Sequence, residues 1–533
     1  MNEAAAERNT PFLQKAGGLW LLCCALAVAA GLILGQDANW DLRNYHYYNA
    51  YAWLNSRYDI DIAPAQIQSW HYPLADIPYY LFARAGVSSW ISTSALALPA
   101  AVALYFVARI YAVLVPGLQR GWIIFALLLV ALTGTAGMPV IGGTMSEWHT
   151  VALFLGAIWL LLKSHPDSSS DSMRFVLAGV LGGAAVGLKL TAAVYAMGLA
   201  AMVLALPGSA GTRLRRLACL GIGGSVAFLL VYAPWGWYVY QRMESPVFPY
   251  FNNIFKSPYA LAIDYKDPRF AKTTLEAILT LPFRLMSSTT GFVSEATLRD
   301  WRLALGFPAL LYLAWRPDSS SIACRFKWRA VLAFFVVSYV LWAGFSGIYR
   351  YAGLLELTAS LAWVACAATI RPARALVAVA IASVVVIATV KQPHWWRIPH
   401  GAPAVVATLP ALPAGSMVVI ATLDPLGYVV PNLPPAIPVI SIINNIMIHS
   451  RAMPKIQDLG VQRIRAHAGP IWRLTRKNGG DEQYYKGTSI DDISLSLGIR
   501  TDRGACLGFS TPLDSDLQFC PVTMVARQRV EPQ

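Results

Sequence analysis

Apolar residues along this chain gather into long runs that short charged segments interrupt, and the pattern continues up to about residue 390. A run of about 20 mainly apolar residues is typical of a helix that crosses a membrane. The pattern predicts a polytopic α-helical membrane protein with about 11 transmembrane helices. The expected spans are residues 17–36, 91–115, 122–137, 148–163, 174–190, 192–206, 217–240, 303–315, 330–346, 352–370 and 375–390.

Composition agrees with this reading. Of the 533 residues 56% are hydrophobic and 13% are charged, whereas soluble domains carry about 25% charged residues. Because apolar runs recur far beyond the first one, residues 17–36 are expected to be a retained span and not a cleaved signal. The net charge of +14 comes from Lys and Arg in short clusters between the runs, which indicates the positive-inside rule and argues against a nucleic-acid partner.

The loop charges place the N-terminus inside, and eleven spans then leave the C-terminus outside. Residues 1–392 are expected to form the transmembrane domain, with large extracytoplasmic loops at 37–90 and 241–301. The segment 393–533 contains the strand-like stretch "SMVVIAT" followed by "DPLGY", which predicts a small C-terminal extracytoplasmic α/β domain.

Two cysteines, Cys506 and Cys520, lie in this C-terminal segment. They are candidates for a disulfide if the segment is extracytoplasmic, and for two free thiols if it is cytosolic.

Ionisable residues at membrane depth are costly and usually mark a functional cavity or pathway. The first such place, "QDANWDLRNYHYYN", follows span 17–36 directly and carries Asp37 and Asp41. One alternative is that an aspartate caps a helix starting near Leu42 while the aromatic rings form an interfacial belt. A carboxylate in a half-buried aromatic mouth can instead act as a general base. The neighbouring candidates for binding sugar or acceptor are Arg43, Asn44, Tyr45, His46 and Tyr48.

The stretch "SWHYPLADIPYY" adds His71 and Asp76 to the same loop. If the loop folds back over the mouth of the first span, Asp76 can share a pocket with Asp41, as paired carboxylates do in glycosyl chemistry. The alternative is a solvated interfacial helix that Asp76 caps.

Three further places break the apolar pattern. Glu147 and His149 open the span at 148–163, where a glutamate is also stabilised by the helix dipole. Lys189 lies in "GVLGGAAVGLKLTAAVYAMG", whose small residues would let a lipid phosphate approach, although a lysine at a span end can also snorkel.

The last place is "FSGIYRYAGLLELTAS", with Tyr349, Arg350 and Glu356. Arginine is suited to bidentate phosphate binding, and the alternative is a structural Arg350–Glu356 ion pair. Under the charge-based topology all four places fall on the outer side, which is the pattern expected for chemistry on a lipid-linked phosphate. The sequence contains no Walker A, GxGxxG, HExxH or CxxC motif, which argues against nucleotide and zinc chemistry.

These features resemble the GT-C superfamily of integral-membrane glycosyltransferases, in particular bacterial members that act in envelope glycan assembly. The resemblance rests on the aspartate-bearing loop after the first span, the lysine in "GLKLTA", the loop "SPVFPYFN", "YRY" before "ELT", and the C-terminal extracytoplasmic segment. It implies a polyprenyl-phosphate-linked sugar donor, a glycan or lipid acceptor, and transfer on the periplasmic face of the bacterial inner membrane.

The resemblance assigns roles to single residues. Asp41 matches the first-loop base of the family, with Asp37 and Asp76 as further catalytic candidates, and Lys189 and Arg350 would neutralise the leaving phosphate. Glu147, His149, His71, Tyr349 and Glu356 are expected to contact sugar or acceptor. Asp37 and Asp41 stand four residues apart and not in a DD or DxD pair, so the choice of base and the need for a divalent cation stay open.

Direct displacement at the anomeric carbon would invert its configuration. The competing readings are an O-antigen ligase or polymerase that uses a lipid diphosphate-linked glycan, a polytopic transporter, and a scaffold whose C-terminal domain binds envelope partners. A transporter is expected to show polar residues near the membrane midplane in repeated halves, whereas here they gather at one face.

Overall fold

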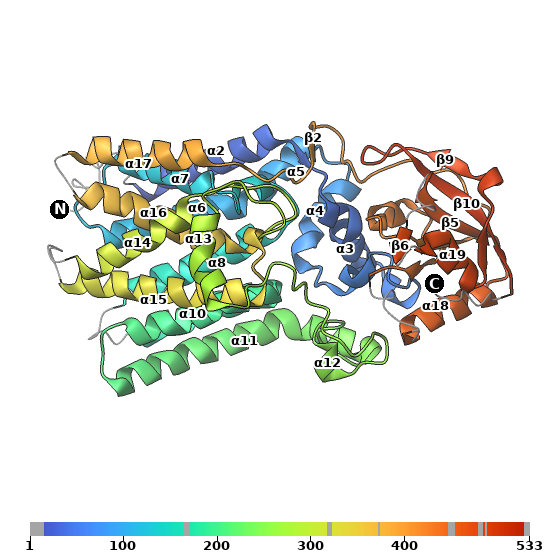
Figure 1. The fold of residues 1–533 in the computed structure, drawn as a ribbon, viewed down its shortest axis with the longest axis horizontal. Helices are drawn as coiled ribbons and strands as arrows, with labels where there is room; N and C mark the ends of the chain where they lie inside the picture. Colours follow the sequence, from blue (N-terminus) through green and yellow to red (C-terminus); the bar gives the residue numbers. More distant parts are fainter. Residues whose placement is uncertain are drawn as a thin grey trace, which may run out of the picture. The chain divides into compact units, whose positions relative to one another are not determined.

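A computed structural model describes residues 15–164, 171–316, 322–370, 374–445, 454–477, 483–485 and 488–526. Helices dominate it up to residue 389, and a sheet lies near the C-terminus (Figure 1). Six helical segments are long and apolar enough to cross a membrane: Ala16–Leu34 (α2), Ser89–Leu114 (α5 and α6), Asp171–Leu188 (α9), Ala210–Met243 (α11), Cys324–Phe345 (in α15) and Tyr349–Ile370 (η8 and α16).

Five shorter apolar helices complete the series: Gly121–Leu132 (α7), Glu147–Leu162 (α8), Leu190–Ala205 (η7 and α10), Arg302–Trp315 (α14) and Ala375–Thr389 (α17). Together the two sets coincide with the expected spans, so the polytopic helical fold is confirmed. The loop before α14 carries one more helix, Leu275–Arg284 (α13). The strongest packing joins α10 to α15, α14 to α16, and α8 to α9 and α6.

Helices α9 and α11 approach so closely that their backbones touch at glycines. A Cβ atom on Gly183 would overlap the carbonyl of Gly224, and one on Gly223 would overlap the carbonyl of Val176. Small residues permit such close helix contacts in membranes. The glycines that precede Lys189 therefore serve helix packing, and the expectation that they make room for a lipid phosphate is wrong for Gly179 and Gly183, because α11 occupies that space.

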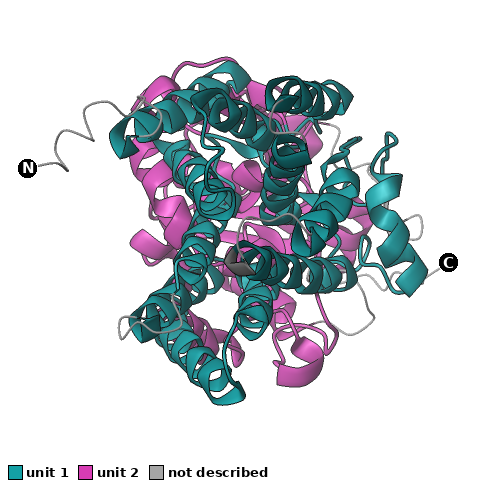
Figure 2. Ribbon diagram, turned by 90° about the vertical axis from the view of Figure 1, so that its left-hand side faces the viewer, with its two compact units in different colours: residues 1–35, 93–233, 267–395 teal, residues 36–92, 234–266, 396–533 magenta. Residues whose placement is uncertain are grey.

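Contacts divide the chain into two compact units (Figure 2). Unit 1 comprises residues 1–35, 93–233 and 267–395, which include most of the apolar helices. Unit 2 comprises residues 36–92, 234–266 and 396–533. The first large loop thus belongs with the C-terminal segment, and the second large loop is shared between the units.

In unit 2 the first loop folds into short helical pieces. Gln36–Asp37 (β1) pairs antiparallel with Arg397–Ile398 (β2). The later elements are the π-helix Leu42–His46 (η2), Tyr47–Leu54 (α3), the 3₁₀ turns Arg57–Asp59 (η3), Gln66–Trp70 (η4) and Leu74–Asp76 (η5), and Ile77–Arg84 (α4). The short helix Asn252–Phe255 (α12) comes from the second loop.

The C-terminal segment forms a sheet with strand order β4-β3-β5-β10-β8, to which β9 adds beside β10. Its strands are Met417–Ala421 (β3), Val439–Ile443 (β4), Ile471–Arg476 (β5), Ile499–Thr501 (β8), Leu507–Phe509 (β9) and Leu517–Met524 (β10). β3 lies parallel to β4 and β5, and every residue of β3 and β4 is buried, as is typical of parallel strands covered on both faces.

Helix Lys455–Ala466 (α18) connects β4 to β5, and Ile490–Ser496 (α19) precedes β8; a separate pair joins Gln483–Tyr485 (β6) to Thr488–Ser489 (β7). The predicted C-terminal α/β fold is confirmed. Cys506 and Cys520 form a disulfide, as expected for an extracytoplasmic segment.

The α9–α11 contact predicts opposite effects for two neighbouring glycines of α11. In the Gly223→Ala variant the new methyl group meets the carbonyl of Val176, and we expect a loss of about 1–3 kcal/mol from overpacking. Gly221 has nothing within 4 Å of its Cβ position, so Gly221→Ala should be neutral or stabilising by up to about 1 kcal/mol, because alanine favours helix. Thermal unfolding of both purified variants in detergent measures the difference, and equal melting temperatures would contradict the close contact.

Candidate functional site

In unit 1 three charged side chains come together from three different spans. Lys189 lies at the break between α9 and η7, where its extended backbone (φ −150°, ψ 104°) interrupts the helix. Its Nζ is 2.6 Å from Oε1 of Glu147, the first residue of α8. Arg350 of η8 places its Nε 3.8 Å from the same oxygen. We call Glu147, Lys189 and Arg350 the cationic site.

Two cations, Lys189 and Arg350, share the Glu147 carboxylate in the cationic site. The Tyr351 ring contributes a face to both cations, with its centroid 4.8 Å from Lys189 Nζ and 5.2 Å from Arg350 Cζ. The Glu147 side chain is 8% exposed, whereas Lys189 and Arg350 keep 21% and 20% of their side-chain surface. The two cations therefore remain accessible to an anion while the carboxylate holds them together.

The structure brings His149 near this site, two residues further along α8. Its Nδ1 and the second oxygen of Glu147 are buried and have no hydrogen-bond partner among the described residues. A polar ligand or ordered water can satisfy such atoms.

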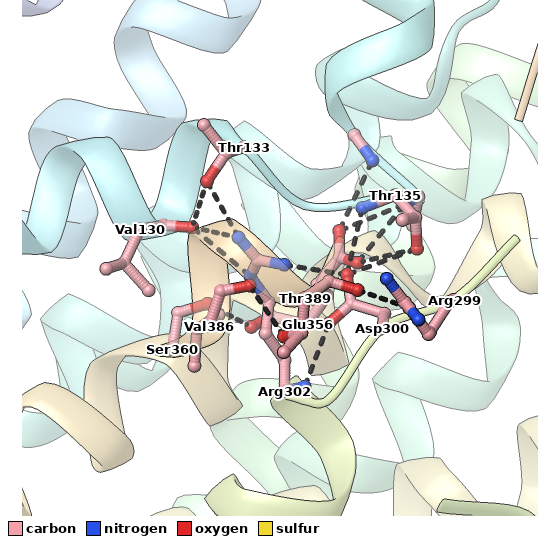
Figure 3. A network of polar contacts seen from close by, with 12 residues as sticks. Val130, Thr133, Thr135, Arg299, Asp300, Arg302, Glu356, Ser360, Val386 and Thr389 are labelled. Carbon is pink, nitrogen blue, oxygen red and sulfur yellow. Dashed lines mark hydrogen bonds and ion pairs between the residues drawn. The ribbon is translucent and has the colours of Figure 1, made fainter. Parts of the chain in front are cut away.

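Glu356 lies elsewhere, in a buried polar network (Figure 3), and Tyr349 donates a hydrogen bond to it. The Glu356 carboxylate accepts hydrogen bonds from the backbone N–H groups of Ala136 and Gly137 and from the Thr135 and Tyr349 hydroxyls, at 3.1–3.3 Å. Both side chains are 1% exposed. The expectation that they contact sugar or acceptor is therefore wrong, because protein groups already occupy their polar atoms.

The alternative of an Arg350–Glu356 ion pair is also wrong, since Arg350 lies beside Glu147 and Glu356 beside the 134–137 loop. The network contains a charged pair that sequence reasoning missed. Arg302, which opens α14, donates to Asp300 at 2.7 Å, and neither side chain is exposed. "RDWR" at the start of an apolar run was the available signal, because it places charges at membrane depth.

Asp300 also connects the network to the loop between α7 and α8. Its Oδ2 accepts from the backbone N–H and the hydroxyl of Thr135 at 3.2 Å, and the same hydroxyl donates to Glu356 at 3.3 Å. Gly134 is required here, because a Cβ atom would overlap the Glu356 carboxylate.

In unit 2 the three candidate aspartates gather around one histidine. His46 Nδ1 lies 2.6 Å from Asp76 Oδ1, with only 6% and 4% of the two side chains exposed. Burial alone lowers the pKa of His46, but the charge of Asp76, followed by those of Asp41 and Asp37, outweighs burial and raises the pKa above its usual value of 6.5. We call these four residues the carboxylate cluster. The first loop folds back so that Asp76 pairs with His46, and the shared pocket of Asp76 and Asp41 stays a prediction.

The helix-cap alternative for Asp41 is wrong. Asp41 makes no side-chain cap hydrogen bond, and the backbone N–H of Leu42 instead donates to Oδ1 of Asn39 at 2.8 Å. Asp37 accepts from the backbone and side-chain N–H groups of Asn39 at 3.1 and 2.6 Å. Asp76 makes no cap bond to α4 either. All three carboxylates are buried, and Asp41, at 8%, is the most exposed.

The other first-loop candidates lie in the core of the loop, in an ion pair with the C-terminal segment, or near the carboxylate cluster. Tyr48 is 1% exposed and donates to Asp61 at 3.2 Å, so it belongs to the core of the loop and its expected contact with sugar is wrong. Arg43 forms an ion pair with Asp514 at 3.1 Å. Tyr45 and His71 stay near the cluster, since the Tyr45 ring centroid is 4.1 Å from that of His46 and 5.0 Å from that of His71.

Several buried polar atoms of the first loop have no hydrogen-bond partner among the described residues. They are Asn44 Oδ1, His46 Nε2, Asn49 Oδ1, Tyr58 OH and Trp70 Nε1. Buried polar groups are normally satisfied, so this region is suited to a polar ligand or ordered water. Sequence reasoning did not select Asn49 or Tyr58, because nothing in their local pattern separates them from the surrounding aromatic residues. Among the described residues no group of three or more His, Cys, Asp or Glu side chains is arranged to hold a metal ion.

No family model and no curated protein matches the chain. Two solved structures match it, both of ArnT from Cupriavidus metallidurans, one bound to undecaprenyl phosphate and one in the apo state. Each has a TM-score of 0.51 and covers 95% of this chain and 98% of ArnT, at 14% and 13% sequence identity respectively. The chain therefore has the fold of ArnT over nearly its whole length.

The His46–Asp76 pair predicts a pH-dependent contribution to stability. Because the pKa of His46 is raised by folding, its ion pair stabilises the fold fully below about pH 6.5 and loses that effect as the pH rises through the raised value. We expect His46→Gln to lower the melting temperature most at about pH 6, and least at about pH 9.

The control is His467→Gln, since the His467 ring bonds the carbonyl of Gly415. This variant replaces a histidine outside the carboxylate cluster and reports the general effect of losing a histidine hydrogen bond at each pH. A gap between wild type and His46→Gln that stays constant or widens toward alkaline pH would contradict the assignment of a charged pair.

Proposed function

We propose that this protein is a membrane glycosyltransferase that moves a sugar from a polyprenyl-phosphate donor to a glycan or lipid acceptor of the bacterial envelope. The observation that carries the proposal is the full-length fold similarity to ArnT, a protein whose structure was obtained with undecaprenyl phosphate. The charged side chains at the starts of the spans support it, because they supply the groups that transfer from a lipid phosphate requires.

The cationic site is our candidate for the donor phosphate. When the glycosidic bond to phosphate breaks, the leaving phosphate gains negative charge, which Lys189 and Arg350 stabilise electrostatically. The phosphate of a sugar phosphodiester is negatively charged and can pair with both cations.

The proton acceptor that we propose is Asp41. The acceptor hydroxyl transfers its proton to the Asp41 carboxylate while its oxygen bonds to the anomeric carbon, and the C–O bond to phosphate breaks with its electron pair staying on the phosphate oxygen. This displacement inverts the anomeric centre. Of the three carboxylates Asp41 is the most exposed, at 8%.

The rest of the carboxylate cluster supports this role. A His46 imidazolium beside Asp76 keeps a positive charge close to Asp41, which favours the ionised carboxylate that a general base requires. We assign Asn44, Tyr45 and His71 to the sugar or acceptor and His149 and Glu147 to hydroxyl groups near the phosphate. The protein is proposed to lie in the inner membrane with these groups and the C-terminal domain on the periplasmic side.

The first test concerns Asp41. We expect Asp41→Asn to remain folded and to lose transfer from a polyprenyl-phosphate sugar by about 10²–10⁴-fold, because an amide does not accept the proton. Transfer is measured with purified protein in detergent, using radiolabelled donor lipid and envelope lipid extract as acceptor. Asp59→Asn is the control, since Asp59 is exposed and pairs with Arg242 at the surface.

Full activity in Asp41→Asn would reject Asp41 as the base. Loss of activity in the Asp59→Asn control as well would show that the assay reports general damage to the loop.

The second test concerns Lys189. We expect Lys189→Met to weaken binding of undecaprenyl phosphate by about tenfold or more, because the variant loses one of the two cations of the cationic site. Lys163→Met is the control: this lysine follows the far end of α8 and lies 4.7 Å from the Trp159 ring centroid. Binding is measured by microscale thermophoresis in detergent, and equal affinity in Lys189→Met and wild type would remove Lys189 from the phosphate site.

A further inference from the structure

The first loop docks on the C-terminal sheet at the edge where the parallel strands end. The side chain of Gln66 donates to the carbonyl of Leu423, just after β3, at 2.9 Å. The backbone N–H of Ile67 donates to the side chain of Asn445, just after β4, at 2.8 Å. In open sheets with parallel strands, ligands usually bind at this edge. Here a segment of the same chain occupies it.

Asp514 is the centre of the charged contacts at this edge. Its carboxylate accepts from Arg476 Nη2 at 2.5 Å, from the Tyr428 hydroxyl at 2.6 Å and from Arg43 Nη1 at 3.1 Å. Asp514 is 6% exposed, and its own backbone N–H is held by the Thr511 hydroxyl at 2.9 Å. An ion pair that is buried and hydrogen-bonded in this way fixes geometry in a way that a solvated surface pair does not.

Arg43 transmits this geometry to the turn that carries Asp41. Besides Asp514, its guanidinium donates from Nε to the carbonyl of Ala38 at 3.1 Å, and its backbone N–H donates to the carbonyl of Asn39 at 3.1 Å. Asp41 is the residue immediately before the π-helix η2, and Arg43 lies within that helix. One guanidinium thus connects the turn 38–41, the start of η2 and the C-terminal carboxylate.

The disulfide supports the carboxylate from its own side. Cys506 and Cys520 flank the connection between β9 and β10 in which Asp514 lies. The pairing of Leu517 with Phe509 and the cross-link together restrict the backbone on both sides of Asp514.

We propose that Asp514 is a positioning residue for the reaction: through Arg43 it holds the turn 38–41 so that Asp41 meets the acceptor hydroxyl. This inference rests on the proposed function for the identity of the reaction, and it gives the C-terminal domain a role in catalysis that does not require it to touch substrate. Misplacement of a catalytic group by about 1 Å can cost about a hundredfold in rate.

The experiment compares Asp514→Asn with Asp516→Asn in the full-length protein. Asp516 binds the same Arg476, through Nη1 at 2.9 Å, but its side chain is 41% exposed. We expect Asp514→Asn to lower kcat by about tenfold or more, with an unchanged KM for the donor lipid, and Asp516→Asn to leave both near wild type. Arg43→Met should match Asp514→Asn, and the double variant should be no slower than either single variant.

A second readout does not depend on activity. Hydrogen–deuterium exchange of residues 38–46 should rise in Asp514→Asn and Arg43→Met and stay at the wild-type level in Asp516→Asn, while exchange in α14 and α16 is unchanged in all three. Asp514→Glu, which keeps the carboxylate, should restore part of the lost protection.

The inference is overturned if Asp514→Asn and Asp516→Asn have equal kcat, if the effects of Arg43→Met and Asp514→Asn multiply, or if exchange in 38–46 does not change. These outcomes are separate from a failure of the proposed function. A wild-type protein without transfer activity would reject the proposed function, whereas the exchange arm would still decide whether Asp514 holds the turn.

Discussion

The helical unit depends on one constraint: a charged side chain buried away from water must have a partner that neutralises its charge. The Asp300–Arg302 pair meets this constraint. Arg302 donates to Asp300 and also, from Nη2, to the carbonyl of Val130 and the hydroxyl of Thr133, both at 2.8 Å. Removing one partner of such a buried pair typically costs about 3–5 kcal/mol. The pair therefore fixes the end of α7 against the start of α14.

Glu356 extends this constraint to the cationic site. By accepting from the loop after α7 and from Tyr349 it holds together the segments that lead to Glu147 and to Arg350. The network explains why two charged groups so close in sequence, Arg350 and Glu356, have different roles. One faces a site that an anion can reach, and the other supports the spans.

The sequence was sufficient where one strong local signal decides the structure. Hydropathy located the eleven apolar helices of the described residues, the strand-like run "SMVVIAT" located β3, and the cysteine pair formed the expected disulfide. It was not sufficient for pairings that folding alone creates. Arg43 meets Asp514 across 471 positions, and Glu356 meets Ala136 across 220.

Local sequence patterns were also ambiguous where the same residue type serves two different physical roles. Glycines near a lysine suit both a ligand and a close helix contact, and the carbonyls of α11 decide for the contact. An aspartate before a helix suits both a cap and a base, and Asn39 takes the cap. The clustering of Asp37, Asp41 and Asp76 was predictable from their common loop, whereas the histidine at its centre was not, because its position depends on the fold of η2 and η5.

The pairing of β1 with β2 has a consequence for the order of biosynthesis. The segment that carries Asp37 and Asp41 emerges early, yet Gln36 binds the carbonyl of Pro399, 363 residues later in the chain. Ribosomes add about 5–20 residues per second, so the first loop waits on the order of tens of seconds for its partner strand, and longer for Asp514. In a nascent chain that has inserted only its early helices, the carboxylates of the first loop therefore lack their contacts with the C-terminal segment. The loop has all of these contacts only after residue 514 has been translated.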